Sequence, residues 1–475
     1  MSFAGSRSRA TQLVALGLAI LPALLGCVEQ HHPQDDGSKR EDDFPDPVDG
    51  CVPGDGPAMD VEASLTDIAT VVRVTWNTAE PTQGAVHFTT ATGPRQTSPS
   101  SGTEHEVLLL GNRANTDVPF RVVTDESGLV SCGDERTITT GALPPELPDL
   151  TVLLDPSYDT EDRGYTVVPV IQQPNTFLVL LDSEAQYVWA WDDPEGMYRG
   201  GLFNADVDLS RGGIYANEQA ESAELPGAIR HVAFDGTLLD SVNVEGGHTD
   251  FVELPTGEMA SLSWDIREVD GGRYLGDRIV EVDAAGASRT VWSVWDHYTP
   301  DPDGGWAPGF YRADPEVMDW SHVNALAYDA GEDAYFLSMA FNQSVARVER
   351  STGAMTWVIG GDGLVESPHS VQPLGDSVLV FNRGSPTDPD SCSEATEIDI
   401  TKRAVVWSYR SEPCLLVPFL GSALRLPNGN TLVDWSSAGQ LDEVTHAGEL
   451  VWRVSLDLGA AFGFADRVPS LYPSE

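Results

Sequence analysis

Three histidines, His248, His322 and His369, each open the same kind of phrase in three consecutive repeats of this sequence. The phrases read HTDFVELPTGEMASL, HVNALAYDAGEDAYFL and HSVQPLGDSVLVF, and each is a short apolar strand followed by a tight turn. Equivalent positions in repeats that stack around an axis lie at equivalent radii, so we expect the three imidazoles to converge on one point. A neutral imidazole can attack an electrophile, and a protonated one can assist a leaving group.

The repeats run from about residue 150 to the end of the chain. Each has an apolar strand, a polar turn and a second strand, and five of the six copies end in a tryptophan: Trp189, Trp292, Trp357, Trp407 and Trp452. The turns are anchored at Asp182, Asp235, Asp283, Arg350, Asp399 and Thr445, which are 53, 48, 67, 49 and 46 residues apart. About 50 residues suffice for a four-stranded blade. The sequence therefore predicts a six-bladed β-propeller over residues 151–475, with the tryptophans packed between blades.

One interval between repeats is longer than the others. The 67-residue interval contains DHYTPDPDGGWAPGFYRADPEVMDW, residues 296–320. A long connection of this kind lies on the surface, and we expect it to overhang one mouth of the propeller.

Residues 51–142 are typical of a separate small domain. VVRVTWNT, GAVHFTT, TEHEVLLL, VPFRVVT and RTITTG alternate apolar and polar residues with turns between them. This pattern resembles a fibronectin type III or immunoglobulin-like β-sandwich. His87 and His105 are expected to point outward from its strands. Residues 143–150 contain LPPELP and form a stiff linker to the propeller. The whole chain is predicted to be all-β.

The N-terminus resembles a bacterial lipoprotein signal. Arg7 and Arg9 precede a short apolar stretch that ends in LLGC, so residues 1–26 are predicted to be removed and Cys27 to carry the lipid. Residues 27–50 are polar and acidic, and we expect them to form a disordered tether. These features place the protein in the bacterial cell envelope, as a lipid-anchored lipoprotein of the outer membrane or cell surface, with the periplasmic face as an alternative. The lipid is the only membrane contact predicted.

The four other cysteines are predicted to form disulfides. Local pairing joins Cys51 to Cys132 and Cys392 to Cys414, which suits an oxidising compartment, although four cysteines allow three pairings. No CxxC spacing favours zinc.

The charge of the chain restricts its partners. With 74 acidic and 27 basic residues, its formal net charge is -47. Such a surface repels nucleic acid and anionic bilayers, so nucleic acid is excluded as a partner.

The propeller region resembles the bacterial arylsulfotransferase family, which transfers a sulfuryl group between phenols without a nucleotide donor. The resemblance is carried by DWSHVNALAYD (319–329), STGAMTWVIGG (351–361), SPHSVQPLGDSVLVFNRG (367–384), GSALRLPNGNTLVDW (421–435) and the closing AFGFADRVPSLYP. It implies a small aromatic sulfate donor, a phenolic acceptor, and neither a metal nor a diffusible cofactor. It says nothing of the oligomeric state.

The resemblance also assigns roles to residues. It implies that His369 is the nucleophile and forms a transient sulfohistidine, that His248 and His322 assist it, and that Asn324 contacts the substrate. Family members commonly carry an arginine in the strand after the HVN triplet, where this sequence reads SMAFNQS, without a cation. Arg383, in FNRG, is a candidate to bind the sulfate in its place.

Two other interpretations of the three histidines remain open. They can be satisfied polar groups beside a water-filled channel in a propeller that only binds ligands or proteins. They can also form a three-histidine zinc site with one open position.

Overall fold

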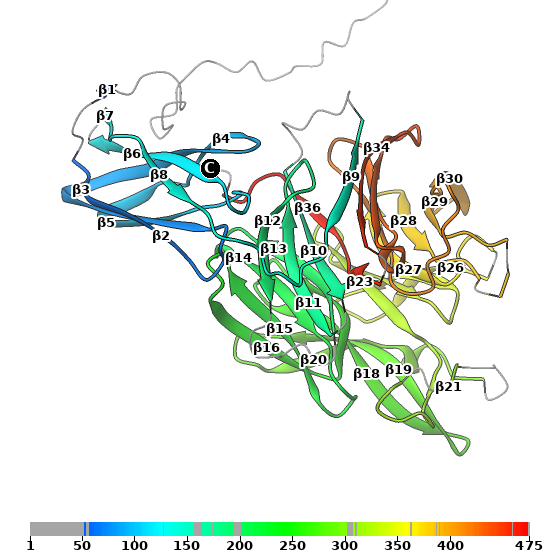
Figure 1. Ribbon diagram of the computed structural model, residues 1–475. Coiled ribbons are helices and arrows are strands. Elements are labelled where there is room, and N and C mark those ends of the chain that lie inside the picture. The colour runs from blue at the N-terminus through cyan, green and yellow to red at the C-terminus, as the bar shows by residue number, and fades with distance from the viewer. Residues whose placement is uncertain are drawn as a thin grey trace, which may run out of the picture. The chain divides into compact units, whose positions relative to one another are not determined.

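The computed structural model describes most of the chain after residue 51 (Figure 1). The described residues are 52–53, 57–126, 128–155, 164–172, 174–192, 201–301, 307–308, 311–361, 363–385, 387–388, 390–457 and 459–473. The predicted signal peptide, lipidation site Cys27 and tether lie outside them. Within these residues, no helix has the length and apolar character needed to cross a bilayer.

The first part of the described chain forms one eight-stranded sheet. Its strands are β1 (Val52–Pro53), β2 (Met59–Leu65), β3 (Val72–Thr90), β4 (Gly93–Gln96), β5 (Ser100–Leu109), β6 (Asp117–Glu126), β7 (Leu129–Cys132) and β8 (Arg136–Thr139). The long β3 pairs with β2 and β5 through its first half and with β4 and β6 through its second half. Apolar side chains from both halves, among them Val74, Trp76 and Phe88, form one core. The small domain and its boundaries remain a prediction.

The expected outward direction of His87 and His105 is wrong. Their exposed fractions are 5% and 3%, and the His105 ring stacks on Trp76 at 4.8 Å. The stacking of His105 on Trp76 places that imidazole in the aromatic core of the sheet.

The remaining chain forms six sheets, which confirms the all-β fold class and the six-bladed β-propeller. Five successive sheets are each built mainly from four antiparallel strands of one repeat. These are β13–β16 (Leu202–Asp208, Gly213–Glu218, Pro226–Ala233, Leu238–Glu245), β17–β20 (Gly247–Glu253, Met259–Val269, Gly272–Val282, Ser288–Ser293), β23–β26 (Val323–Asp329, Ala334–Met339, Ser344–Glu349, Met355–Gly360), β27–β30 (Pro368–Leu374, Ser377–Asn382, Glu394–Asp399, Ala404–Tyr409) and β31–β34 (Ser422–Arg425, Thr431–Asp434, Gln440–Val444, Leu450–Leu456). We number them blades 2 to 6.

Blade 1 and blade 6 join the two ends of the propeller. Blade 1 consists of β10 (Tyr165–Gln172), β11 (Asn175–Leu181) and β12 (Tyr187–Asp192), and its inner edge is completed by β35 (Ala461–Phe462) and β36 (Asp466–Val468) from the end of the chain. Blade 6 gains β9 (Leu150–Leu154) beside β34. Figure 1 shows the red C-terminal β36 beside β10 and the cyan β9 beside β34. The ring is therefore closed by strands from both ends of the propeller region.

The repeated phrase of the sequence is the outer hairpin of each blade. All six anchor residues fall at the turn between the third and fourth strands, and each outer hairpin has one register shift, for example between Leu180 and Leu181. The tryptophans of this hairpin contact the following blade, as predicted: Trp189 joins a core with Leu202 of blade 2, and the Trp407 indole donates to the carbonyl of His446 in blade 6.

Two short features complete the fold. The interval between blades 3 and 4 contains a 3-10 turn, η1 (Val294–Asp296), and two short strands, β21 (Ala307–Pro308) and β22 (Met318–Asp319), that extend the sheet of blade 3. A second 3-10 turn, η2 (Ser436–Ala438), follows β32.

One predicted disulfide is present, between Cys392 and Cys414, with a Cα–Cα distance of 5.6 Å. Cys132 is also disulfide-bonded. Its predicted partner Cys51 lies outside the described residues, so that pairing stays a prediction.

Candidate active site

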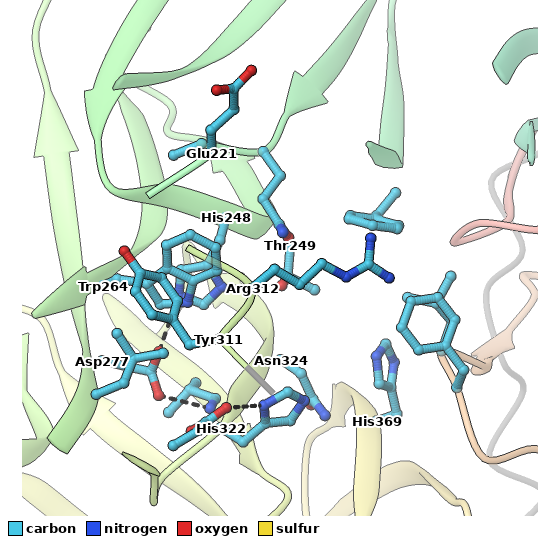
Figure 2. Close-up of a pocket in the computed structure, with 18 of the residues that line it drawn as sticks. Glu221, His248, Thr249, Trp264, Asp277, Tyr311, Arg312, His322, Asn324 and His369 are labelled. Atoms are coloured by element: carbon cyan, nitrogen blue, oxygen red, sulfur yellow. Dashed lines mark hydrogen bonds and ion pairs between the residues drawn. The ribbon is translucent and has the colours of Figure 1, made fainter. Parts of the chain in front are cut away.

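A cavity of about 540 Å³ contains all five residues that the sequence singles out as a site (Figure 2). Its lining includes His248, His322, Asn324, His369 and Arg383. The other lining residues are Phe203, Gln219, Ala220, Glu221, Thr249, Trp264, Leu275, Asp277, Tyr311, Arg312, Asp319, Val323, Phe419 and Leu420. The predicted convergence of the three imidazoles on one place is therefore observed.

The inner strands of blades 3, 4 and 5 position these imidazoles at equivalent places. His248 lies on β17, His322 directly precedes β23, and His369 lies on β27. In each blade the pairing of the first two strands shifts register at this point. Such bulges turn side chains away from the regular direction of a strand. His322 itself has a φ of 47°, a conformation that non-glycine residues rarely adopt and that is common at functional sites.

His369 is held as a neutral imidazole. It is buried, with an exposed fraction of 3%, and its Nδ1 lies 3.0 Å from the carbonyl oxygen of Gly421. A carbonyl only accepts, so Nδ1 carries the hydrogen and Nε2 carries the lone pair. Burial, followed by the charges of Arg383 and His322, holds the pKa of His369 well below its ordinary value of 6.5. This side chain therefore has the protonation state of a nucleophile.

The position of Gly421 depends on its lack of a side chain. Its φ is 97°, and a Cβ there would lie 2.3 Å from the ring of Phe381. Only glycine combines this conformation with that close approach, and both are needed to direct the carbonyl toward His369.

His322 has a carboxylate partner instead of a carbonyl. Its Nδ1 lies 2.6 Å from Oδ2 of Asp319, and its ring stacks on Phe341 at 4.7 Å. Asp319 is fully buried; burial raises the pKa of this carboxyl group, and His322 opposes the rise. The contact fixes the orientation of the ring at the cavity wall, as in Figure 2.

His248 lies against two polar side chains. Its Nδ1 is 3.0 Å from the hydroxyl of Thr249, within hydrogen-bond distance. Its Nε2 is 3.0 Å from Oδ1 of Asp277 but without the geometry of a hydrogen bond. Its ring also stacks on Trp264 at 4.9 Å. This imidazole is thus a fixed part of the cavity wall.

Asp277 connects blade 3 to the segment that carries His322 and Asn324. Its Oδ2 accepts hydrogen bonds from the Ser321 hydroxyl at 2.5 Å and from the Val323 N–H at 2.9 Å. Because its other oxygen faces His248, one carboxylate positions two of the three histidine segments.

Asn324 presents an oriented amide to the cavity. Its oxygen accepts from the Ser338 hydroxyl at 2.5 Å, and its NH₂ donates to the carbonyl of Pro368 at 3.1 Å. An amide NH₂ has two hydrogens, so one donor remains for a ligand. Ser338 opens the SMAFNQS stretch, so this segment supports Asn324 and supplies no charge.

Two arginines supply positive charge to the cavity. Arg383 is buried and donates to the carbonyl and hydroxyl of Ser367 and to the carbonyl of Pro418. Burial lowers its pKa to about 10, so it stays protonated at neutral pH. Arg312 comes from the interval between blades 3 and 4. Neither arginine has an ion pair with a carboxylate in the part of the chain that the structure describes.

Aromatic side chains form the walls beside these polar groups. Tyr311 meets Trp264 edge to face, with ring centroids 5.3 Å apart. Phe203 and Phe419 form a second edge-to-face pair at 6.1 Å. The cavity thus offers flat apolar walls next to two arginine side chains.

The described residues contain no group of three or more His, Cys, Asp or Glu side chains arranged to hold a metal ion. The three-histidine zinc interpretation therefore finds no support in this cavity.

Several residues of the cavity were not predicted from the sequence. Asp319 lies three residues before His322 in DWSH, and this spacing could have indicated a carboxylate partner for the imidazole. Asp277 had none, because its contacts cross to the next blade. Tyr311 and Arg312 belong to the interval that was expected only to overhang a mouth.

Comparison with known proteins supports one family. Residues 165–374 match the family model described as arylsulfotransferase (ASST). The match covers less than half of the 475 residues and includes His248, His322, Asn324 and His369, but ends before Arg383. It supports sulfuryl transfer of the nucleotide-independent kind at the level of the family. No curated protein matches the chain.

Solved structures resemble the propeller only distantly. A protein of unknown function from Bacteroides caccae is 12% identical, with 64% of this chain and 99% of that chain covered and a TM-score of 0.43. Streptogramin B lyase is 12% identical, with 67% and 98% covered and a TM-score of 0.38. The WD40 propeller domain of Doa1 is 11% identical, with 66% and 89% covered and a TM-score of 0.38. At these values none of the three bears on function.

Proposed function

We propose that this protein belongs to the arylsulfotransferase family and transfers a sulfuryl group from an aryl sulfate ester to a phenolic acceptor through His369. The observation that carries the proposal is the contrast between His369, a buried neutral imidazole in the same cavity as Arg383, and His322, whose Nδ1 faces the Asp319 carboxylate. A neutral imidazole can attack as a nucleophile, and an imidazole held by a carboxylate can transfer a proton.

In the first half of the reaction, Nε2 of His369 attacks the sulfur atom. An N–S bond forms, the bond between sulfur and the aryl oxygen breaks, and its electron pair leaves with the phenolate. His322 donates a proton from Nε2 to this oxygen, while Asp319 stabilises the imidazolium before the transfer. The products are a phenol and a sulfohistidine.

In the second half, the same groups act in reverse. The acceptor phenol gives its proton to neutral His322, and its oxygen attacks the sulfur of the sulfohistidine. The N–S bond breaks, and His369 recovers its lone pair. Because the proton returns to His322, this residue begins the next cycle as the acid again.

The negative sulfuryl oxygens need donors that are already in place. Arg383 supplies a buried positive charge from blade 5, and Asn324 supplies its second N–H from blade 4. Both are held by hydrogen bonds to neighbouring groups, so little reorganisation is required when charge builds up.

His248 acts by position in this proposal. Since its ring lies against Thr249, Trp264 and Asp277, it is a positioning residue for these three side chains. The Trp264 and Tyr311 rings and the Phe203 and Phe419 rings provide two faces against which aryl groups can stack.

Incubation of the full chain with 4-nitrophenyl sulfate tests the proposal. We expect release of 4-nitrophenol that accelerates when phenol is added, and loss of both activities in His369→Asn. His297→Asn is the matched control, because His297 lies outside the cavity and is exposed. The proposal is contradicted if no 4-nitrophenol is released, with or without added phenol. It is also contradicted if His369→Asn releases 4-nitrophenol as fast as the natural chain.

We further propose that the chain is exported and anchored through Cys27, with residues 51–142 as a β-sandwich between the anchor and the propeller. The Cys392–Cys414 disulfide supports an oxidising compartment. Metabolic labelling with a fatty acid, compared between the natural chain and Cys27→Ser, tests the anchor.

A further inference from the structure

The interval between blades 3 and 4 is anchored at the edge of the active-site cavity. The Tyr311 ring is buried with an exposed fraction of 4%, and its hydroxyl accepts a hydrogen bond from the Ala223 N–H at 2.6 Å. Three residues later, Asp314 pairs with Arg273, and Val317 is fully buried against Leu275 and Tyr311. The backbone of Arg312 is therefore fixed on both sides.

The side chain of Arg312 extends across the cavity. Figure 2 shows its guanidinium group beyond Thr249, on the side where His369 lies. Most arginines that the structure describes form ion pairs with carboxylates, as Arg350 does with Glu281. In a chain with 74 acidic residues, an arginine that instead faces a cavity without a carboxylate partner among the described residues is suited to an anionic ligand.

The cavity also needs this charge. The strand after the HVN triplet, β24, contributes Ser338 and no cation. Arg383 already uses three of its five N–H groups on Ser367 and Pro418. Its remaining N–H donors come from blade 5 alone. The three oxygens of a sulfuryl group point in three directions, so they need donors from other parts of the cavity as well.

We propose that Arg312 binds the oxygens of the sulfuryl group together with Arg383, so that a residue of the inserted interval replaces the cation missing from β24. This inference rests on the proposed function for its ligand. Arg312 is also exposed, so ligand binding draws its guanidinium out of water and into a charge-assisted hydrogen bond, which is roughly twice as strong as a neutral one.

Binding of inorganic sulfate to the full chain tests the inference without turnover. We expect Arg312→Gln to weaken sulfate binding, measured by calorimetry, by about 10- to 100-fold, the usual value of a hydrogen bond to a charged group. Arg312→Lys, which keeps the charge and loses the fork, is expected to recover part of the affinity. Phenol binding and the melting temperature are expected to stay unchanged, since neither depends on the cation.

Arg136→Gln is the matched control, because Arg136 is exposed in the small sheet and donates to the carbonyl of Val61. Equal sulfate affinity of Arg312→Gln and the natural chain, or no sulfate binding by the natural chain, overturns the inference. If aryl sulfate is never turned over but sulfate binding still depends on Arg312, the proposed function fails and the anion site stands. If turnover occurs and Arg312→Gln binds sulfate and reacts as the natural chain does, only the inference fails.

Discussion

Replacing Asp277 tests how the blades position the active site. In Asp277→Ala, two buried groups lose their hydrogen-bond acceptor: the Ser321 hydroxyl and the Val323 N–H. Each unsatisfied group costs about 1–3 kcal/mol. Because water from the cavity can reach some of them and the buried charge is removed, the lower value applies to each group, and we expect about 2 kcal/mol less stability.

Asp277→Asn separates charge from position. The amide oxygen can keep both contacts to Ser321 and Val323, and the NH₂ can face His248 if that imidazole donates from Nδ1 to Thr249. We expect a stability loss below about 1.5 kcal/mol, in line with one weakened contact. Turnover should fall about 100-fold in the alanine variant, as a displacement of about 1 Å can cost, and less in the asparagine variant.

Urea unfolding and 4-nitrophenyl sulfate turnover measure the two effects. Asp240→Ala is the control, because Asp240 forms an exposed ion pair with Arg211, and such pairs contribute about 0–1 kcal/mol. If Asp277→Ala unfolds within about 1 kcal/mol of the natural chain, or reacts equally fast, Asp277 does not position the histidine segments and the reasoning is refuted.

Three further predictions concern charge and the closure of the ring. In the unfolded chain His369 binds a proton near pH 6.5, whereas the pKa of His369 in the folded protein lies well below this value. As the pH falls below about 6.5, the natural chain should therefore lose up to about 1.4 kcal/mol more stability per pH unit than His369→Asn. Parallel profiles of unfolding free energy against pH for the two proteins would refute this. Cys392→Ser with Cys414→Ser opens a loop with a sequence separation of 22 and should cost about 3 kcal/mol in unfolding experiments, while an unchanged urea midpoint would contradict it. Removing residues 457–475 takes away β35 and β36, so the exposed edge of β10 should cause aggregation or proteolysis, and a soluble, protease-resistant product would speak against closure by these strands.

The propeller was predictable because its signal is local. Each outer hairpin is about a dozen residues of alternating pattern with a turn and a tryptophan, as in the stretch around Asp182 and Trp189, and six copies reinforce one another. Closure of the ring by β35 and β36 could not be predicted, since pairing between residues some 300 positions apart leaves no periodic trace in either segment.

The histidines were predictable for the same reason, and their partners were not. His248, His322 and His369 recur at one place in the repeat, so ring geometry alone brings them together. Asp277 contacts Val323 across a blade boundary, and Arg312 reaches the cavity from a segment in which Tyr311 is anchored on Ala223. Such contacts depend on tertiary packing, which a single sequence does not encode as a motif.

Mass spectrometry of the protein after brief mixing with 4-nitrophenyl sulfate, in the absence of a phenol, tests the central claim most directly. The account predicts an added sulfuryl group on the peptide that contains His369, lost again when phenol is supplied. A sulfuryl group on another residue, or unmodified protein while 4-nitrophenol is released, would contradict it.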